Sequence, residues 1–234
     1  MSTYFITATG TGVGKTFVTA ALCYQLRSHG NPARTLKPVI SGYNEKDLEN
    51  SDSGILLNSM GIQPCHEEVQ KISPWRFSAA ISPDMAAQRE NRHIDFEELL
   101  QFCRNISAQK NSSQKHVIFI EGVGGAMVPL DEEHTVMDWM ATLDVPTLVV
   151  AGSYLGTISH TLTTVEAMSR NSIRPVAIII SESQENPVPL ELTSETISRF
   201  LPEIPVATVP RIATSKHAWK KAPDLRGLIK IPGD

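Results

Sequence analysis

A glycine-rich run between an apolar segment and a helical segment constrains this chain more than any other feature. The run TATGTGVGKT, residues 7–16, overlaps the end of the apolar segment Tyr4–Thr7 and the start of the helical segment Lys15–Ser28. Glycines let successive backbone N–H groups turn toward one anion, and a helix N-terminus adds partial positive charge. Lys15 can then bridge phosphate oxygens, and the Thr16 hydroxyl can ligate Mg²⁺. The pattern predicts a strand, a phosphate-binding loop and a helix, in that order.

One position of this loop departs from the usual spacing. The pattern G-x-x-x-x-G-K-[ST] places a glycine at position 9, where this chain has Thr9, while Gly10 and Gly12 lie inside the loop. The order of strand, glycine-rich loop, Gly-Lys-Thr and helix is intact. The sequence therefore favours phosphate binding over a chance glycine-rich turn.

Short apolar, β-branched runs alternate with longer helical stretches along the whole chain. Continuous apolar runs are typical of parallel strands covered on both faces. The alternation predicts an α/β fold: a single-domain, doubly wound, mostly parallel sheet of the P-loop NTPase type over residues 1–234, with a flexible tail after about residue 215. The predicted strands are Tyr4–Thr7, Thr35–Val39, Val117–Ile120, Thr147–Ala151 and Val176–Ile180, and the predicted helices are Lys15–Ser28, Asp52–Met60, Phe96–Ile106, Ile158–Ser169 and Leu190–Phe200.

Composition narrows the class of protein. The chain has 21 basic and 25 acidic residues and a net charge of −4 with neutral histidines, which argues against nucleic acid as a partner. The start lacks the features of a secretory signal, and no apolar run is long enough to span a bilayer. Its three cysteines are too few and too far apart for a disulfide framework or a zinc site. We therefore expect a cytoplasmic protein that binds neither nucleic acid nor membrane.

A second glycine-rich turn follows the predicted strand Val117–Ile120. The segment VIFIEGVGG, residues 117–125, ends its apolar run on Glu121 and then turns on glycines. Ligands of doubly wound sheets bind beyond the carboxyl ends of the strands, so a carboxylate there faces the crevice and can reach Mg²⁺. The alternative is a surface glutamate after a buried strand. The turn that follows at once favours the metal-binding interpretation.

Seven segments together resemble the dethiobiotin synthase family. They are TATGTGVGKT at 7–16, TLKPVISG at 35–42, NSDS at 50–53, SPWRF and ISPDMAAQ within 73–88, IEGVGGAMVPL at 120–130 and AGSYLGTISH at 151–160. The combination of K-P-V-x-S-G with E-G-x-G-G-x-x-x-P is far more specific than a phosphate loop alone. The resemblance extends to about residue 182 and is thin beyond it.

The resemblance implies a homodimeric, ATP-dependent enzyme that closes the ureido ring of dethiobiotin from 7,8-diaminononanoate, CO₂ (or bicarbonate) and ATP. One amine takes up CO₂ as a carbamate, and the γ-phosphoryl group of ATP is transferred to that carbamate. The second amine then closes the ring and expels phosphate. Phosphoryl transfer of this kind needs positive charge around a highly anionic assembly, which two lysines and Mg²⁺ would supply.

The resemblance also assigns roles to residues. It places Thr16, Asp52 and Glu121 on Mg²⁺, and Lys15, Lys37 and Thr11 at the reacting groups, with Ser41 on the substrate. Taken alone, Lys37 is interpreted as a solvated lysine at a strand end, and Ser51-Asp52 as the N-cap of a helix. The implied nucleotide-binding residues are Gly12, Val13, Gly14, Lys15, Thr16, Phe17, Asp52, Glu121, Gly122, Val123 and Gly124 for the triphosphate and its metal, and Ser181, Glu182, Val209, Pro210 and Arg211 for the base.

The far end of the substrate carries a carboxylate, and the helix that opens after Gly156 is a suitable seat for it. Free N–H groups and the hydroxyls of Thr157 and Ser159 can bind a carboxylate, and in the family this seat comes from the neighbouring subunit. Capping of a surface helix by a hydroxyl is an equal alternative. At the base-contacting strand end this chain has Ser181-Glu182 where an Asn-Asp pair is common, so the use of other nucleoside triphosphates stays open.

The main rival is a dimerising ATPase of the ParA/MinD type, a partitioning or scaffold protein of the same fold class. That group carries an additional lysine early in its phosphate loop, where this chain has Gly10. A second rival, an amidoligase with a glutaminase domain, requires a longer chain and a nucleophilic cysteine in a tight turn. The sequence favours the synthase over both.

Overall fold

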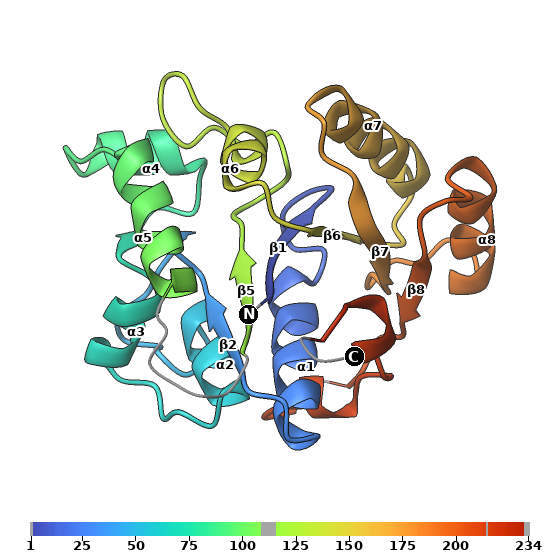
Figure 1. Ribbon diagram of the computed structural model, residues 1–234, viewed down its shortest axis with the longest axis horizontal. Coiled ribbons are helices and arrows are strands. Elements are labelled where there is room, and N and C mark those ends of the chain that lie inside the picture. Colours follow the sequence, from blue (N-terminus) through green and yellow to red (C-terminus); the bar gives the residue numbers. More distant parts are fainter. Residues whose placement is uncertain (1, 109–115, 214, 232–234) are drawn as a thin grey trace.

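A parallel β-sheet forms the centre of the molecule (Figure 1). The computed structural model describes residues 2–108, 116–213 and 215–231. The sheet has six strands in the order β2-β5-β1-β6-β7-β8, and each neighbouring pair is parallel, which confirms the predicted α/β class. The strands are β1 (Ser2–Ala8), β2 (Ala33–Leu36), β5 (Val117–Glu121), β6 (Thr147–Ala151), β7 (Pro175–Ser181) and β8 (Val206–Val209), and a separate parallel pair is formed by β3 (Val39–Ser41) and β4 (Trp75–Phe77).

Helices cover both faces of the sheet. On one face α1 packs beside α2, and on the other α5 packs beside α6 and α7 beside α8. Right-handed crossovers between parallel strands place the helices in this way. Within the described ranges, none of the helices has the length and apolar character needed to cross a bilayer. The helices are α1 (Lys15–Ser28), α2 (Asp52–Ser59), α3 (His66–Ile72), α4 (Pro83–Arg89), α5 (Phe96–Ala108), α6 (Val136–Leu143), α7 (Thr157–Arg170) and α8 (Leu190–Phe200).

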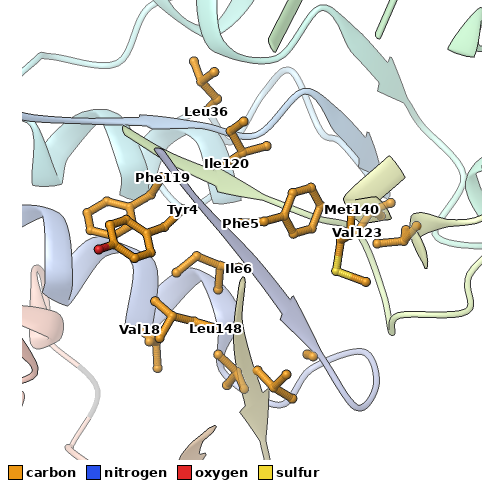
Figure 2. Packing of buried hydrophobic residues seen from close by; sticks show 14 of the residues in the cluster. Tyr4, Phe5, Ile6, Val18, Leu36, Phe119, Ile120, Val123, Met140 and Leu148 are labelled. Carbon is orange, nitrogen blue, oxygen red and sulfur yellow. The ribbon is translucent and has the colours of Figure 1, made fainter. Parts of the chain in front are cut away.

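The central strand β1 supplies core residues to both layers of helices. Figure 2 shows Phe5 on the side of Met140 in α6, whereas Ile6 lies on the side of Val18 in α1. Successive side chains of a strand point to opposite faces, so both sides of β1 must be apolar. The Phe5 ring meets the Trp139 ring edge-on at a centroid separation of 4.9 Å. Full burial of such side chains contributes roughly 1.5–3 kcal/mol each.

The predicted strand Thr35–Val39 is wrong as one element. β2 ends at Leu36, and β3 begins at Val39 in the separate two-stranded sheet. Pro38 has no N–H to donate to a ladder, and the N–H of Lys37 donates to the carbonyl of Ile72 rather than to a sheet neighbour (3.0 Å). The break leaves Lys37 at the carboxyl edge of the main sheet.

The sequence led us to expect a flexible tail after about residue 215, of which residues 232–234 lie outside the described part of the chain. The segment 215–231 packs against α1 and against Tyr4 of β1 (Figure 1). Two short 3₁₀ helices, Ala218–Lys221 and Arg226–Leu228, lie in it. The Gln25 side chain in α1 donates to the carbonyl of Pro223 and accepts from the N–H of Leu225. The hydroxyl of Tyr4 donates to the carbonyl of Lys230 and accepts from its N–H. These bonds fasten the segment to the N-terminal half of the domain.

Candidate active site

The phosphate-binding loop predicted from the sequence connects β1 to α1 at the carboxyl edge of the sheet. Gly14 adopts φ 97°, in the left-handed region, and its carbonyl accepts the first backbone bond of α1 from Val18. Lys15 is buried and turns back over the loop. Its Nζ donates to the carbonyl of Gly10 at 3.1 Å and to that of Gly124 at 2.6 Å. The side chain thus links the two glycine-rich turns singled out in the sequence.

Lys37 and Glu121 meet because their strands are neighbours in register. Leu36 of β2 pairs with Ile120 of β5, so the next residues of the two strands lie side by side at the sheet edge. Lys37 Nζ donates to Glu121 Oε1 at 2.8 Å and to the carbonyl of Gly122 at 2.7 Å, and both side chains are buried. Lys37 is therefore not a solvated surface lysine.

Asp52 joins the same cluster from the start of α2. Ser51, not Asp52, is the N-cap: its Oγ accepts from the N–H of Gly54 at 3.0 Å. The Asp52 carboxylate is thereby left free to approach Lys37, and its Oδ2 lies 3.4 Å from Lys37 Nζ. The N-cap alternative for Ser51-Asp52 is therefore confirmed at Ser51, and it leaves the Asp52 side chain available for another role.

Burial and opposite charges shift the proton affinities of the cluster. Burial, reinforced by the nearby Lys37 ammonium, lowers the pKa of Lys15 to about 8. Burial also disfavours the charged form of Lys37, but Glu121 and Asp52 outweigh it and raise the pKa of Lys37. Burial acts against ionisation of Asp52, yet the nearby Lys37 ammonium outweighs it and lowers the pKa of Asp52. Lys37 and Asp52 are thus charged at neutral pH.

The residues predicted to hold Mg²⁺ lie together and suit it chemically. Thr16 Oγ1 donates to Glu121 Oε1 at 2.7 Å, whereas the buried Glu121 Oε2 has no hydrogen-bond partner in the described part of the chain. An unpartnered buried carboxylate oxygen is costly unless a further ligand binds it. Mg²⁺ prefers oxygen ligands and usually takes one or two carboxylates with waters and phosphate oxygens. Glu121, Asp52 and Thr16 are a donor set of that kind.

A cavity of about 630 Å³ opens above this cluster. It brings together predicted residues from four separate parts of the sequence and adds a wall that the sequence reasoning did not assign. Five of its six residues lie in motifs that carried the resemblance, Ile40 in TLKPVISG, Ile81, Ser82 and Pro83 in ISPDMAAQ, and Val128 in IEGVGGAMVPL, but no role was assigned to them. The predicted residues are Thr11, Gly12, Gly14, Lys15, Thr16, Phe17, Lys37, Ser41, Asp52, Val123 and Gly124, and the additional ones are Ile40, Ala80, Ile81, Ser82, Pro83 and Val128.

A second cavity of about 380 Å³ shares Gly12, Gly14 and Phe17 with the first. It contains all five predicted base-contacting residues, Ser181, Glu182, Val209, Pro210 and Arg211, together with Val13, Ser183, Gln184 and Ile212. Both oxygens of Glu182 already accept hydrogen bonds, Oε2 from the backbone N–H of Arg211 and Oε1 from the Asn186 amide. The carboxylate thus fixes the shape of this cavity.

The predicted carboxylate seat at the start of α7 lines neither cavity. Thr157 is buried and its hydroxyl donates to the carbonyl of Gly152 at 2.7 Å, so that proton is already used. Gly156 and Ser159 are exposed, and Leu155 beside them is 88% exposed. Within one chain the structure therefore does not bring Gly156, Thr157 and Ser159 to the other predicted site residues.

A parallel α/β sheet with a lysine-bearing phosphate loop and a buried carboxylate on the neighbouring strand defines a P-loop nucleotide-binding protein. A family model described as an AAA domain matches residues 2–218. The chain is 46% identical over 220 residues to the ATP-dependent dethiobiotin synthetase BioD of Acidiphilium cryptum, covering 94% of this chain and 97% of that protein. It is 41% identical to the BioD of Methylobacterium nodulans, covering 85% and 89%. The chain belongs to the ATP-dependent dethiobiotin synthetase family.

Two solved structures of similar fold are MinD cell division proteins. MinD of Pyrococcus horikoshii, in complex with Mg-ADP, is 13% identical with a TM-score of 0.55, covering 94% of this chain and 85% of that one. The MinC:MinD complex of Aquifex aeolicus gives 15% identity and a TM-score of 0.54, covering 94% and 86%. At such identities the likeness is one of fold alone. The rival assignment to the ParA/MinD group is accordingly less supported than the synthetase family.

Proposed function

We propose that this protein is a cytoplasmic ligase that forms dethiobiotin from 7,8-diaminononanoate, CO₂ and ATP, with release of ADP and phosphate. The observation that carries the proposal is the position of Lys37, whose buried ammonium lies in the cavity that the phosphate loop lines. A carbamate that receives a phosphoryl group needs a positive charge of this kind.

The two lysines would divide the negative charge of the reacting groups. Lys15 would lie against the triphosphate, since it is anchored between the loop carbonyls of Gly10 and Gly124. Lys37 would face the carbamate and the transferred phosphoryl group. Mg²⁺, held by Thr16, Asp52 and Glu121, would neutralise charge on the phosphate oxygens. Attack by an amine on the activated carbonyl needs orientation more than a strong base.

The larger cavity has walls that fit the remainder of the substrate. Thr11 and Ser41 offer hydroxyls close to the lysines, whereas Ile40, Ile81 and Val128 are apolar. An aliphatic chain with two amines at one end suits such a surface, because polar groups fix the reacting end and apolar groups bury the chain. The second cavity, next to Phe17, would hold the nucleotide base.

A second subunit would complete the site. The exposed turn at Leu155 and Gly156 lies outside both cavities of its own chain, so the α7 N-terminus can reach a substrate carboxylate only across a subunit interface. The available groups there are backbone N–H groups and the exposed Ser159, since the Thr157 hydroxyl is already bonded. We therefore propose a homodimer with the substrate site at its interface.

The test is ADP release from MgATP and bicarbonate with and without 7,8-diaminononanoate, together with acid-stable fixation of labelled CO₂. We expect both signals to depend on the diamine and to vanish when Mg²⁺ is chelated. Lys37→Ala should reduce both by about a hundredfold or more, because a preorganised charge at the reacting group is lost. Lys46→Ala, a change at an exposed lysine, should leave both unchanged.

Turnover of ATP that ignores the diamine, without fixed label, would contradict the synthase. Nucleotide-dependent association in the absence of diamine would then point to the dimerising ATPase instead. Replacement of ATP by CTP, GTP or UTP in the same assay reports base selectivity, because Ser181 lacks the paired donor and acceptor of an amide.

A further inference from the structure

The Lys37 ammonium occupies the centre of the proposed metal site. An ammonium has three N–H donors, and the three acceptors around Lys37 Nζ are Glu121 Oε1 at 2.8 Å, the Gly122 carbonyl at 2.7 Å and Asp52 Oδ2 at 3.4 Å. Thr16 reaches the same Glu121 oxygen at 2.7 Å. Each of the three residues proposed to bind Mg²⁺ is therefore tied to this one cation, directly or through Glu121.

Burial makes a cation at this point necessary when no metal is bound. Glu121 is wholly buried, and an isolated carboxylate in such surroundings is unfavourable. Lys37 satisfies it, and the pair comes from neighbouring strands that are fixed in register. Removal of one partner from a buried ion pair is strongly destabilising, because it leaves the other charge uncompensated. The Lys37 ammonium thus compensates the charge of the buried carboxylate, as a bound metal ion would.

The charge balance of the cluster differs between binding of the metal ion alone and binding of the metal ion together with nucleotide. The two carboxylates Glu121 and Asp52 balance the two ammoniums of Lys15 and Lys37. A divalent cation added alone would leave an excess of positive charge in a largely buried cluster, where such charges are poorly screened. A nucleotide triphosphate brings the compensating negative charge. The same phosphate oxygens also offer the Lys37 ammonium a new partner within the cavity that they share.

We propose that Lys37 is a placeholder cation, which occupies the carboxylates of the metal site until Mg²⁺ arrives with nucleotide and displaces it toward the reacting groups. The proposal rests on the proposed function in taking Thr16, Asp52 and Glu121 as metal ligands and Lys37 as the cation at the transferred phosphoryl group. It explains why a lysine needed at the phosphoryl group lies against Glu121, a proposed metal ligand. The lysine becomes available to the substrate only once metal and nucleotide are in place.

The test measures binding of Mn²⁺, a spectroscopic substitute for Mg²⁺, by electron paramagnetic resonance without nucleotide or diamine. We expect weak binding to the unsubstituted protein. Lys37→Met frees both carboxylates without adding a charge, and should tighten Mn²⁺ binding by at least about tenfold. Lys37→Arg keeps a cation in place, and should bind Mn²⁺ as weakly as the unsubstituted protein.

Lys15→Met is the matched control. It also removes one ammonium from the cluster, but Lys15 donates to the carbonyls of Gly10 and Gly124, so its loss frees no carboxylate. We expect a clearly smaller gain than with Lys37→Met. An equal gain in Mn²⁺ affinity in the two variants overturns the proposal, because the gain would then come from the loss of one positive charge and not from the release of the carboxylates. Unchanged or weaker Mn²⁺ binding to folded Lys37→Met overturns it as well.

Loss of one partner from a buried ion pair can unfold a protein, so a second measurement uses the unsubstituted chain. The ammonium resonances of ¹⁵N-lysine-labelled protein are recorded, with Lys37→Arg to assign the Lys37 signal. We expect this signal to persist with millimolar Mg²⁺ alone and to change when Mg²⁺ is added with a non-hydrolysable ATP analogue. A signal that changes with Mg²⁺ alone, or is unaltered by both, overturns the proposal. Neither experiment involves turnover, so its outcome is separate from that of the synthase assay.

Discussion

Gly14 is the residue at which the phosphate loop depends most directly on backbone conformation. Its φ of 97° is strained for any residue with a side chain, and a Cβ there would lie 2.5 Å from Ser181 Oγ. We expect Gly14→Ala to lower the free energy of unfolding by about 1–3 kcal/mol. ATP affinity should fall with it, because the loop N–H groups would no longer converge on one anion. Urea unfolding and equilibrium nucleotide binding measure the two effects.

Gly10→Ala is the control from the same loop. Gly10 has no atom within 4 Å of a Cβ and does not adopt the left-handed conformation. Its free energy of unfolding should therefore change by less than about 0.5 kcal/mol. Equal destabilisation by the two substitutions would show that strain at Gly14 is not the cause.

At this scale the sequence predicted the identity of the site residues better than their contacts. Lys37 and Glu121 could each be selected because they follow apolar runs, but their contact depends on the β2–β5 register, which no local pattern contains. Ser51 and Asp52 were both acceptable caps, and the outcome depends on which side chain faces the Gly54 N–H. The Thr157 hydroxyl donates to the Gly152 carbonyl and is therefore not available to a ligand, and this hydrogen bond depends on the fold of the turn between the two residues.

Among the elements, α2 carries Asp52 and depends on a close approach at Gly54. A Cβ at Gly54 would overlap the carbonyl oxygen of Leu48, which is backbone and cannot rotate away. We expect Gly54→Ala to cost about 1–3 kcal/mol of unfolding free energy and to shift the first turn of α2. Because that turn positions Asp52, the metal concentration for half-maximal activity should rise. Urea unfolding and a metal titration of the assay test both effects.

Gly227→Ala, in the 3₁₀ helix Arg226–Leu228, serves as the control for the Gly54→Ala substitution. A Cβ at Gly227 meets no atom of the described residues within 4 Å. This control substitution should alter neither stability nor the metal titration. If Gly54→Ala loses stability but keeps the metal dependence of the unsubstituted protein, α2 does not position Asp52 in the way described here.

The elements with strong local signals were the ones that the sequence could predict. The limits of Lys15–Ser28, Thr147–Ala151 and Leu190–Phe200 agree with the structure. Helix α6 was missed, although Thr135 and Asp138 form a capping box at its start, because its apolar run is short. The pair of β3 and β4 was missed because three-residue strands have no periodicity to read.

At the scale of the whole molecule, the sheet order brings the phosphate loop, Lys37 and Glu121 together. β5 lies between β1 and β2, so the turn after Glu121 lies between the phosphate loop and the chain that follows β2. Alternation of strands and helices predicted a doubly wound sheet, but not which strands are neighbours. That order comes from long-range packing, including the C-terminal segment that returns to Tyr4 and Gln25.

The proposed subunit association can be tested at the turn before α7. Leu155 in this turn is 88% exposed in the single chain. An apolar side chain suits the core of a subunit interface, whereas a charged one is disfavoured there. We expect the unsubstituted protein to sediment as a dimer and Leu155→Asp to shift it toward monomer. The KM for the diamine should rise by about tenfold or more, with little change in the KM for ATP, because only the carboxylate seat would come from the other subunit. Leu192→Asp, at a 51% exposed leucine of α8, should change neither property. A monomeric unsubstituted protein that is fully active would refute the shared site, since the α7 N-terminus lines neither cavity of its own chain.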